Sequence, residues 1–157
     1  MKILMVCLGN ICRSPLAEGI IRAKLMRVPG NFEVDSAGTG GWHSGENPDA
    51  RSIKVARMHG IDISEQRARQ LIKDDLQRFD LIFAMDQSNF RNIRLLSAPE
   101  NYHKIHLYLE FAGSGIADIP DPWYGDFSDF EQVYRLLDTT AERVIQRLVD
   151  EYVNKEL

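Results

Sequence analysis

The stretch "KILMVCLGNICRSP", residues 2–15, joins an apolar run to a polar segment that ends in proline. Its first part, Lys2–Cys7, is continuously apolar after the lysine, which is typical of a strand buried on both faces of a parallel sheet. Pro15 predicts the start of a helix, because the first helical residue needs no N–H group. The residues between them are therefore predicted to form a tight loop that leads from a buried strand into a helix.

The rest of the chain continues this alternation of strands and helices. Apolar runs predict strands in residues 32–38, 79–85 and 104–109, and apolar spacing predicts helices in residues 16–27, 48–59, 86–96 and 128–155. Asp86 or Ser88 is the predicted cap of the third helix, and Ser128 with Glu131 forms the predicted capping box of the last. Such alternation predicts an α/β fold, a three-layer sandwich in which helices flank a four-stranded parallel sheet.

Composition limits the function classes. The 157 residues are 44% hydrophobic and carry a net charge of −4, so no overall basic field favours nucleic acid or an anionic membrane. No apolar run approaches the ~20 residues of a membrane-spanning helix, and the N-terminal run is interpreted as a strand rather than a signal peptide. Both cysteines lie in the opening loop, which argues against a disulfide framework and for a cytoplasmic protein with reduced thiols.

The opening loop has the residues needed to bind a tetrahedral dianion such as phosphate. Backbone N–H groups at a helix N-terminus can form a nest with partial positive charge. Gly9 permits tight curvature, Asn10 tolerates a left-handed backbone, and Arg13 presents a planar fork for two oxygens. Cys7 would lie beneath the bound anion, where a thiolate stabilised by Ser14 can attack phosphorus. The spacing Cys-x5-Arg alone would favour an ordinary buried cysteine; the strand-loop-helix context favours the nucleophile.

A second segment, "DIPDPWYGD" at residues 118–126, can supply the general acid that such chemistry requires. Asp121 precedes a proline that holds it extended, and Trp123 and Tyr124 can flank an aromatic ring. Asp121 is therefore predicted to protonate the leaving oxygen and then to activate water. The alternative is a rigid turn that caps the last helix, with Asp126 as the cap, while a calcium loop is disfavoured by the spacing of the acids.

Taken together, these segments resemble the low-molecular-weight protein tyrosine phosphatases over essentially the whole chain. The matching segments are "VCLGNICRSPLAE", "DSAGT", "HGI", "RARQL", "FDLIFAMDQSN" and "DPWYGD". The resemblance implies a single phosphatase domain over residues 1–157, with a four-stranded parallel sheet of the flavodoxin-like type. It also implies hydrolysis of phosphotyrosine and small aryl phosphates through a phosphocysteine, with no metal and no organic cofactor.

The resemblance also implies roles for single residues. By position, Cys7 matches the nucleophile, Arg13 the phosphate clamp, Ser14 the hydroxyl that stabilises the thiolate, and Asp121 the general acid and base. The matching phosphate-binding loop consists of Cys7, Leu8, Gly9, Asn10, Ile11, Cys12, Arg13 and Ser14. The residues that match the walls of the substrate cleft are Leu8, Trp42, Trp123 and Tyr124.

Three supporting positions follow from the same match. Ser36 matches a residue that helps to hold the loop asparagine, and Asp86 matches the acid that orients the arginine. Gln66 is a departure, because many members carry a histidine there that supports the asparagine; glutamine can also form hydrogen bonds, so the loop is expected to survive. The basic cluster "RARQ" is interpreted as a solvated helix start, and the four histidines show no metal-ligand spacing with the cysteines.

The implied partners are tyrosine-phosphorylated proteins, among them a bacterial tyrosine autokinase, with neither nucleic acid nor membrane insertion involved. The oligomeric state is not predicted. Thiol-dependent arsenate reductases of this fold use later cysteines, which this chain lacks, and protein arginine phosphatases carry threonine where Ile11 stands. A phosphopeptide-binding module and a redox enzyme that uses both cysteines stay open as alternatives. Cys12 is also interpreted as a reversible disulfide partner that protects Cys7 from over-oxidation, rather than as a small packing residue.

Overall fold

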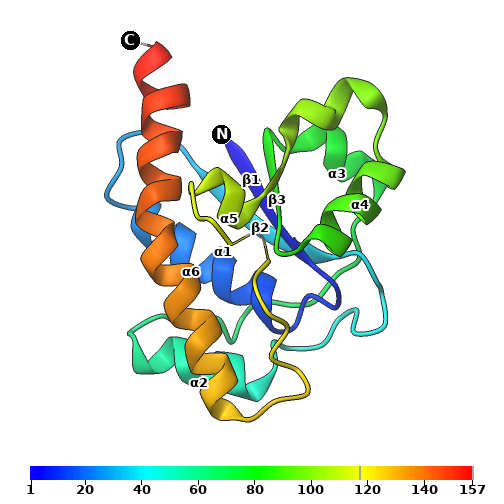
Figure 1. The fold of residues 1–157 in the computed structure, drawn as a ribbon, viewed down its shortest axis with the longest axis vertical. Helices are drawn as coiled ribbons and strands as arrows, with labels where there is room; N and C mark the ends of the chain where they lie inside the picture. The colour runs from blue at the N-terminus through cyan, green and yellow to red at the C-terminus, as the bar shows by residue number, and fades with distance from the viewer. Residues whose placement is uncertain (117, 157) are drawn as a thin grey trace.

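Strand β1, Lys2–Cys7, lies inside a four-stranded parallel sheet (Figure 1). The computed structural model describes residues 1–116 and 118–156; Ala117, in the predicted loop before Asp121, and Leu157 lie outside the described residues. β1 pairs with β2, Glu33–Gly38, on one side and with β3, Leu81–Ala84, on the other, and β3 pairs with β4, Ile105–Leu107. The order is β2-β1-β3-β4.

Both faces of β1 are buried, as its continuous apolar run predicts. Ile3 and Met5 belong to one apolar core, and Leu4 and Val6 belong to a second core on the opposite face. The first core packs against α1, α2, α5 and α6, which span Arg13–Leu25, Ala50–Met58, Tyr108–Phe111 and Phe127–Leu148. The second packs against α3, Lys73–Arg78, and α4, Gln87–Leu96. The predicted three-layer α/β fold is confirmed (Figure 1).

Several predicted helix starts are wrong by a few residues. α1 begins at Arg13 and not at Pro15, which is tolerated in the first turn because the N–H groups there have no partners within the helix. α2 begins after Asp49, whose carboxylate accepts the N–H of Arg51, so Pro48 lies outside the helix. For α4 the predicted cap Asp86 is confirmed, and the alternative, Ser88, lies inside the helix.

Of the two caps suggested for the last helix, Asp126 is confirmed, and Ser128 with Glu131 is wrong. α6 is capped by Asp126, whose carboxylate accepts the N–H of Ser128, and Asp129 completes the capping box. Ser128 and Glu131 are therefore helical residues. After Leu148 the chain continues as a wider helical turn, Val149–Val153, and a 3-10 turn, Asn154–Glu156.

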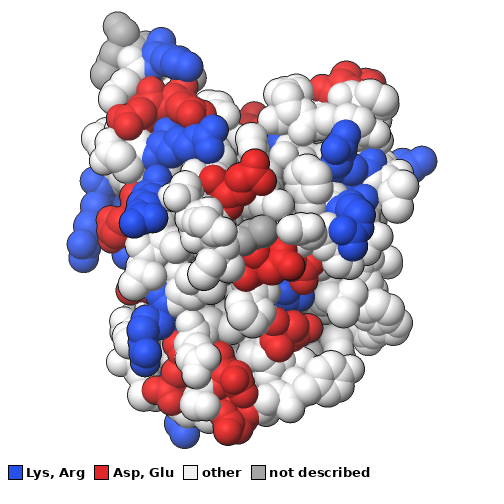
Figure 2. Space-filling view, in the orientation of Figure 1, with Lys and Arg blue, Asp and Glu red and all other residues white. Residues whose placement is uncertain are grey.

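The short elements α3, α5 and a 3-10 helix over Pro99–Lys104 were not predicted, because none is long enough to show helical periodicity. The predicted strand 104–109 ends at Leu107, where α5 begins. In the part of the chain that the structure describes, no helix combines the length and apolar character needed to cross a membrane. Acidic and basic side chains are interspersed on the face in Figure 2.

Candidate active site

The residues at the carboxyl end of β2 hold the start of the loop that follows β1. The N–H of Thr39 donates to the carbonyl of Cys7, and the N–H of Gly40 donates to the carbonyl of Leu8, both at 2.9 Å. Gly38 is required at this point, because a Cβ there would lie 2.7 Å from the carbonyl oxygen of Leu8. The loop is thus held against β2 at the edge where parallel α/β sheets bind ligands.

Cys7 ends β1 and is 3% exposed. Its Sγ accepts the backbone N–H of Asn10 at 3.3 Å and lies 3.0 Å from Oγ of Ser14. The structure therefore brings a hydroxyl and a backbone N–H to the sulfur.

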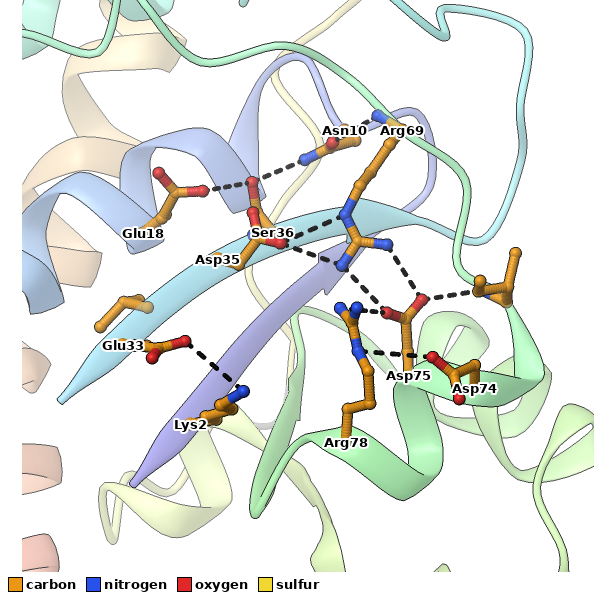
Figure 3. Close-up of polar contacts among 12 residues, drawn as sticks. Lys2, Asn10, Glu18, Glu33, Asp35, Ser36, Arg69, Asp74, Asp75 and Arg78 are labelled. Carbon is orange, nitrogen blue, oxygen red and sulfur yellow. Dashed lines mark hydrogen bonds and ion pairs between the residues drawn. The ribbon is translucent and has the colours of Figure 1, made fainter.

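Asn10 is held in a left-handed conformation with φ of 58°, which asparagine tolerates better than most residues. Its Nδ2 donates to Oγ of Ser14 at 2.8 Å and to Oγ of Ser36 at 2.9 Å, while its Oδ1 accepts the N–H of Arg69 at 3.0 Å. Figure 3 shows that Ser36 in turn donates to Glu18, at 2.9 Å. The side chain of Asn10 therefore has every polar atom engaged.

Glu18 lies one turn beyond Ser14 on α1 and is almost fully buried. Burial raises the pKa of its carboxyl above the ordinary value, while Arg22 at 2.9 Å and the hydroxyl of Ser36 work in the opposite direction. Glu18 therefore ends a chain of hydrogen bonds that starts at the sulfur of Cys7.

Arg13 is buried in the first turn of α1. Its guanidinium contacts Asp86, the cap of α4, and residues 119–121 of the acid segment. Nη1 donates to Oδ2 of Asp86 at 2.6 Å and to the carbonyl of Ile119 at 3.0 Å, and Nη2 lies 3.8 Å from Oδ2 of Asp121. Burial works against its charge, yet Cys7 and Asp86 hold the pKa of Arg13 above its ordinary value. The other oxygen of Asp86 caps α4 through the N–H of Asn89, so one carboxylate fixes both the helix and the arginine.

A pocket of about 280 Å³ opens above this loop. Its lining brings together Cys7, Leu8, Gly9, Ile11, Cys12, Arg13, Trp42, His43, Asp121, Trp123 and Tyr124. Trp42 and Tyr124 are 73% and 94% exposed, so these aromatic walls extend beyond the pocket into solvent. The nucleophile, arginine, acid and cleft residues proposed from the sequence therefore surround one cavity, with Asn10 and Ser14 beneath it.

The loop keeps its asparagine in place despite Gln66, as expected, but Gln66 is not one of its supports: it donates to the carbonyl of Pro15 at 3.2 Å and not to Asn10, and its Oε1 is buried without a hydrogen-bond partner among the described residues. The interpretation of the basic cluster is wrong. The cluster "RARQ" starts no helix, and Arg69 within it is not a solvated cation. Its guanidinium bonds to both oxygens of Asp75 and to Asp35 at 3.0–3.2 Å (Figure 3).

Other residues around the pocket were missed from the sequence. His43 lines the pocket and pairs with Glu46. Asp49 and Arg51 form an ion pair at the start of α2. Of the two, only Asp49 could have been found from its neighbours in the sequence, because an aspartate after a proline is typical of a helix cap. In residues 1–116 and 118–156, no group of three His, Cys, Asp or Glu side chains could hold a metal ion.

The fold and the pocket define a class of protein: a parallel α/β protein whose pocket, at the carboxyl edge of the sheet, is lined by a loop that carries a cysteine and an arginine. The sequence model of the family described as low molecular weight phosphotyrosine protein phosphatase matches residues 2–155. The chain belongs to this family, and so to the hydrolases of the protein tyrosine phosphatase type.

Individual relatives agree with the family match. The low molecular weight protein-tyrosine-phosphatase YfkJ of Bacillus subtilis is 39% identical over 153 residues, which cover 96% of this chain and 97% of the relative. A crystal structure of a protein tyrosine phosphatase from Entamoeba histolytica superposes with a TM-score of 0.90 at 34% identity, covering 96% and 97% of the two chains. Vibrio vulnificus Wzb in complex with benzylphosphonate superposes with 0.84 at 32% identity, covering 94% and 98%.

Proposed function

We propose that residues 1–157 act as one phosphatase domain that hydrolyses phosphotyrosine and small aryl phosphates through a phosphocysteine on Cys7. The observation that carries this proposal is the convergence of Cys7, Arg13 and Asp121 on one pocket with aromatic walls. The complex of a relative, Wzb, with benzylphosphonate supports an aryl phosphate as the ligand, because that compound carries a phosphonate on a benzyl group.

In the first proposed step, the thiolate of Cys7 attacks phosphorus and the bond from phosphorus to the tyrosine oxygen breaks. Arg13 and the backbone N–H groups of the loop bind the non-bridging oxygens. The carboxyl of Asp121 gives its proton to the departing oxygen, so tyrosine leaves as a neutral phenol. Ser14 donates to the sulfur and favours its thiolate form.

In the second proposed step, water attacks the phosphorus of the phosphocysteine. The carboxylate of Asp121 takes a proton from that water, and the bond between phosphorus and sulfur breaks. Inorganic phosphate leaves, and Cys7 returns to a thiolate while Asp121 is again a carboxyl group. The residues of the chain therefore complete the cycle with water as the only other reactant.

The proposed partners are tyrosine-phosphorylated proteins, and a bacterial tyrosine autokinase is one such substrate. We also propose that the enzyme works in the cytoplasm, because a catalytic thiolate requires a reducing environment. A phosphopeptide-binding module would use the same loop, but it would need neither a buried sulfur nucleophile nor an acid beside Arg13.

The test is turnover of matched phosphotyrosine, phosphoserine and phosphoarginine peptides with EDTA present, using wild type and Cys7→Ser. We expect phosphate release from phosphotyrosine alone, abolished in the variant. Preference for phosphoarginine would contradict the role given to the aromatic walls. Phosphate binding without turnover of any peptide would favour the binding module.

Cys12 is proposed as a redox partner of Cys7. Peroxide converts the Cys7 thiolate to a sulfenic acid, and attack by the Cys12 sulfur then forms a disulfide and releases water. Burial raises the pKa of the Cys12 thiol, as do the nearby charges of Asp49 and Cys7. We expect dithiothreitol to restore peroxide-treated wild type but not Cys12→Ser, and equal recovery of both would contradict the proposal.

A further inference from the structure

We infer that Arg51 is a positioning residue for the general acid: from the start of α2 it holds the segment 121–126, and so sets where the carboxyl of Asp121 lies over the phosphate loop. The inference rests on the function proposed above, and extends it to a residue outside the phosphate loop and the acid segment. Arg51 is the second residue of α2, which spans Ala50–Met58.

The segment that carries Asp121 has few other anchors. Its side chains are exposed apart from Pro122, and within it the N–H of Trp123 donates to Asp121 and the N–H of Gly125 to the carbonyl of Pro122. From other elements, Arg13 lies 3.8 Å from the carboxylate of Asp121 and the ring of His43 lies 5.7 Å from that of Trp123, while Arg51 binds the backbone of the segment. Nη2 of Arg51 donates to the carbonyl of Trp123 at 3.2 Å, and its Nη1 donates to the carbonyl of Gly125 at 3.1 Å.

Arg51 is itself fixed in place. Asp49 accepts from its Nε and Nη2, each at 3.0 Å, in a bidentate pair that orients the planar guanidinium. Its Cζ lies 4.2 Å from the ring centroid of Phe130, a buried residue of α6, and its side chain is only 33% exposed. Figure 1 shows α2 beside the start of α6, where this stacking occurs.

The same turn of α2 also holds the phosphate loop. The N–H of Asp49 donates to the carbonyl of Ile11 at 2.7 Å, and Oγ of Ser52 donates to the carbonyl of Cys12 at 3.2 Å. Residues 49–52 therefore bind two carbonyls of the nucleophile loop and two carbonyls of the acid segment. This turn is a brace that fixes the acid relative to the nucleophile, and Arg51 is the part of it that reaches the acid segment.

Loss of Arg51 should therefore damage the proton transfer and leave the attack by Cys7 intact. Proton donation matters for a poor leaving group and hardly at all for a good one, because a stable phenolate needs no proton to depart. The quantity to measure is kcat/KM, which reports transfer to Cys7 and not the later hydrolysis of the phosphocysteine.

The experiment compares phenyl phosphate with 2,4-dinitrophenyl phosphate for wild type, Arg51→Met, Asp121→Asn and the double variant. For Arg51→Met we expect kcat/KM to fall about tenfold or more with phenyl phosphate and less than about threefold with the dinitrophenyl ester. In the Asp121→Asn background, the additional effect of Arg51→Met should be below about twofold, because the acid through which it acts is absent. Arg57→Met is the matched control on the same helix, where the guanidinium pairs only with Asp62 at 4.0 Å among the described residues.

An equal loss for both esters, the same loss in the Asp121→Asn background, or no loss with phenyl phosphate would each overturn the inference. Failure of the proposed function looks different, because wild type would then show no Cys7-dependent turnover of either ester. Should Arg51→Met fail to fold, Arg51→Lys keeps a cation near Phe130 but cannot span both carbonyls, and a smaller loss confined to phenyl phosphate is expected.

Discussion

Asn10 combines an unusual backbone with a fully engaged side chain. Its φ of 58° is costly for residues other than glycine and asparagine, and its amide joins Ser14, Ser36 and the N–H of Arg69. Asn10→Gly removes only the amide, whereas Asn10→Ala also adds the cost of the left-handed conformation. We expect Asn10→Ala to unfold with a free energy about 1 kcal/mol lower than Asn10→Gly in urea titrations.

Both Asn10 variants should also lose kcat/KM for aryl phosphates, because Ser14 loses its donor. Equal stability of the two variants would show that the loop relaxes to another backbone conformation. Equal activity of Asn10→Gly and wild type would show that the amide does not hold the hydroxyl of Ser14 in place.

Glu18 makes stability depend on pH with a definite sign. Burial raises the pKa of its carboxyl above the ordinary 4.5, so the folded protein binds this proton more tightly than the unfolded chain does. Ionisation of Glu18 therefore costs stability as pH rises through 4.5 toward the raised pKa. Glu18→Gln lacks this titration, so the free energy of unfolding of wild type minus that of the variant should fall as pH rises through this window.

Urea titrations of both proteins between pH 4 and pH 8 measure that difference. A difference that instead grows with pH would mean that the ion pair with Arg22 outweighs burial, and that the pKa of Glu18 is lowered in the folded protein.

At the scale of elements, α3 supports the phosphate-binding loop through Arg69. The guanidinium of Arg69 binds Asp75 on α3, and its backbone N–H donates to Asn10 in the loop. Asp75 on α3 is fully buried, accepts hydrogen bonds from Arg69 and from the N–H of Ile72, and forms an ion pair with Arg78 at 3.5 Å. Removal of one partner from a buried ion pair leaves the other charge poorly compensated. We expect Asp75→Ala to lower the free energy of unfolding by about 3 kcal/mol.

Asp74→Ala is the matched control for that substitution. Asp74 is the preceding residue of α3, its side chain is 61% exposed, and it pairs only with Arg78 at 3.5 Å among the described residues. A surface pair of this kind contributes about 0–1 kcal/mol. Equal losses in the two variants, measured by urea unfolding, would contradict the structural role assigned to Asp75.

The elements that were predictable from sequence are those determined by residues close to one another in the chain. β1 and the start of α1 lie within fourteen consecutive residues, and their apolar run, glycine and proline all act on near neighbours. The ion pairs of Arg69 with Asp35 and Asp75 were not predictable. Asp35 lies 34 residues away in the sequence, and no residue next to Arg69 indicates that the two side chains meet. The cap of α6 was ambiguous, since Asp126 and Ser128 both fit the pattern and only the register of the helix separates them.

For the molecule as a whole, anion binding should couple to stability. The proposed phosphate site is complete only when the loop, α1 and the acid segment are together, so phosphate is expected to bind the folded state alone. At a phosphate concentration of about 100 Kd, we expect about 2.7 kcal/mol of added stability and a rise in Tm of about 5–10 °C. Scanning calorimetry in phosphate and in sodium chloride of equal ionic strength tests this, and an equal rise in both salts would contradict specific binding.

The walls of the pocket come from segments far apart in the chain, namely Cys7 to Arg13, Trp42 with His43, and Asp121 to Tyr124. During translation, more than one hundred residues must follow the loop before the acid segment emerges. During that interval the nascent chain therefore carries the Cys7 thiol without the acid segment that completes the site. Chemical damage to this thiol is thus a hazard of biosynthesis as well as of the finished enzyme, and until the acid segment emerges its protection falls to the cell and to Cys12, which is synthesised within five residues of it.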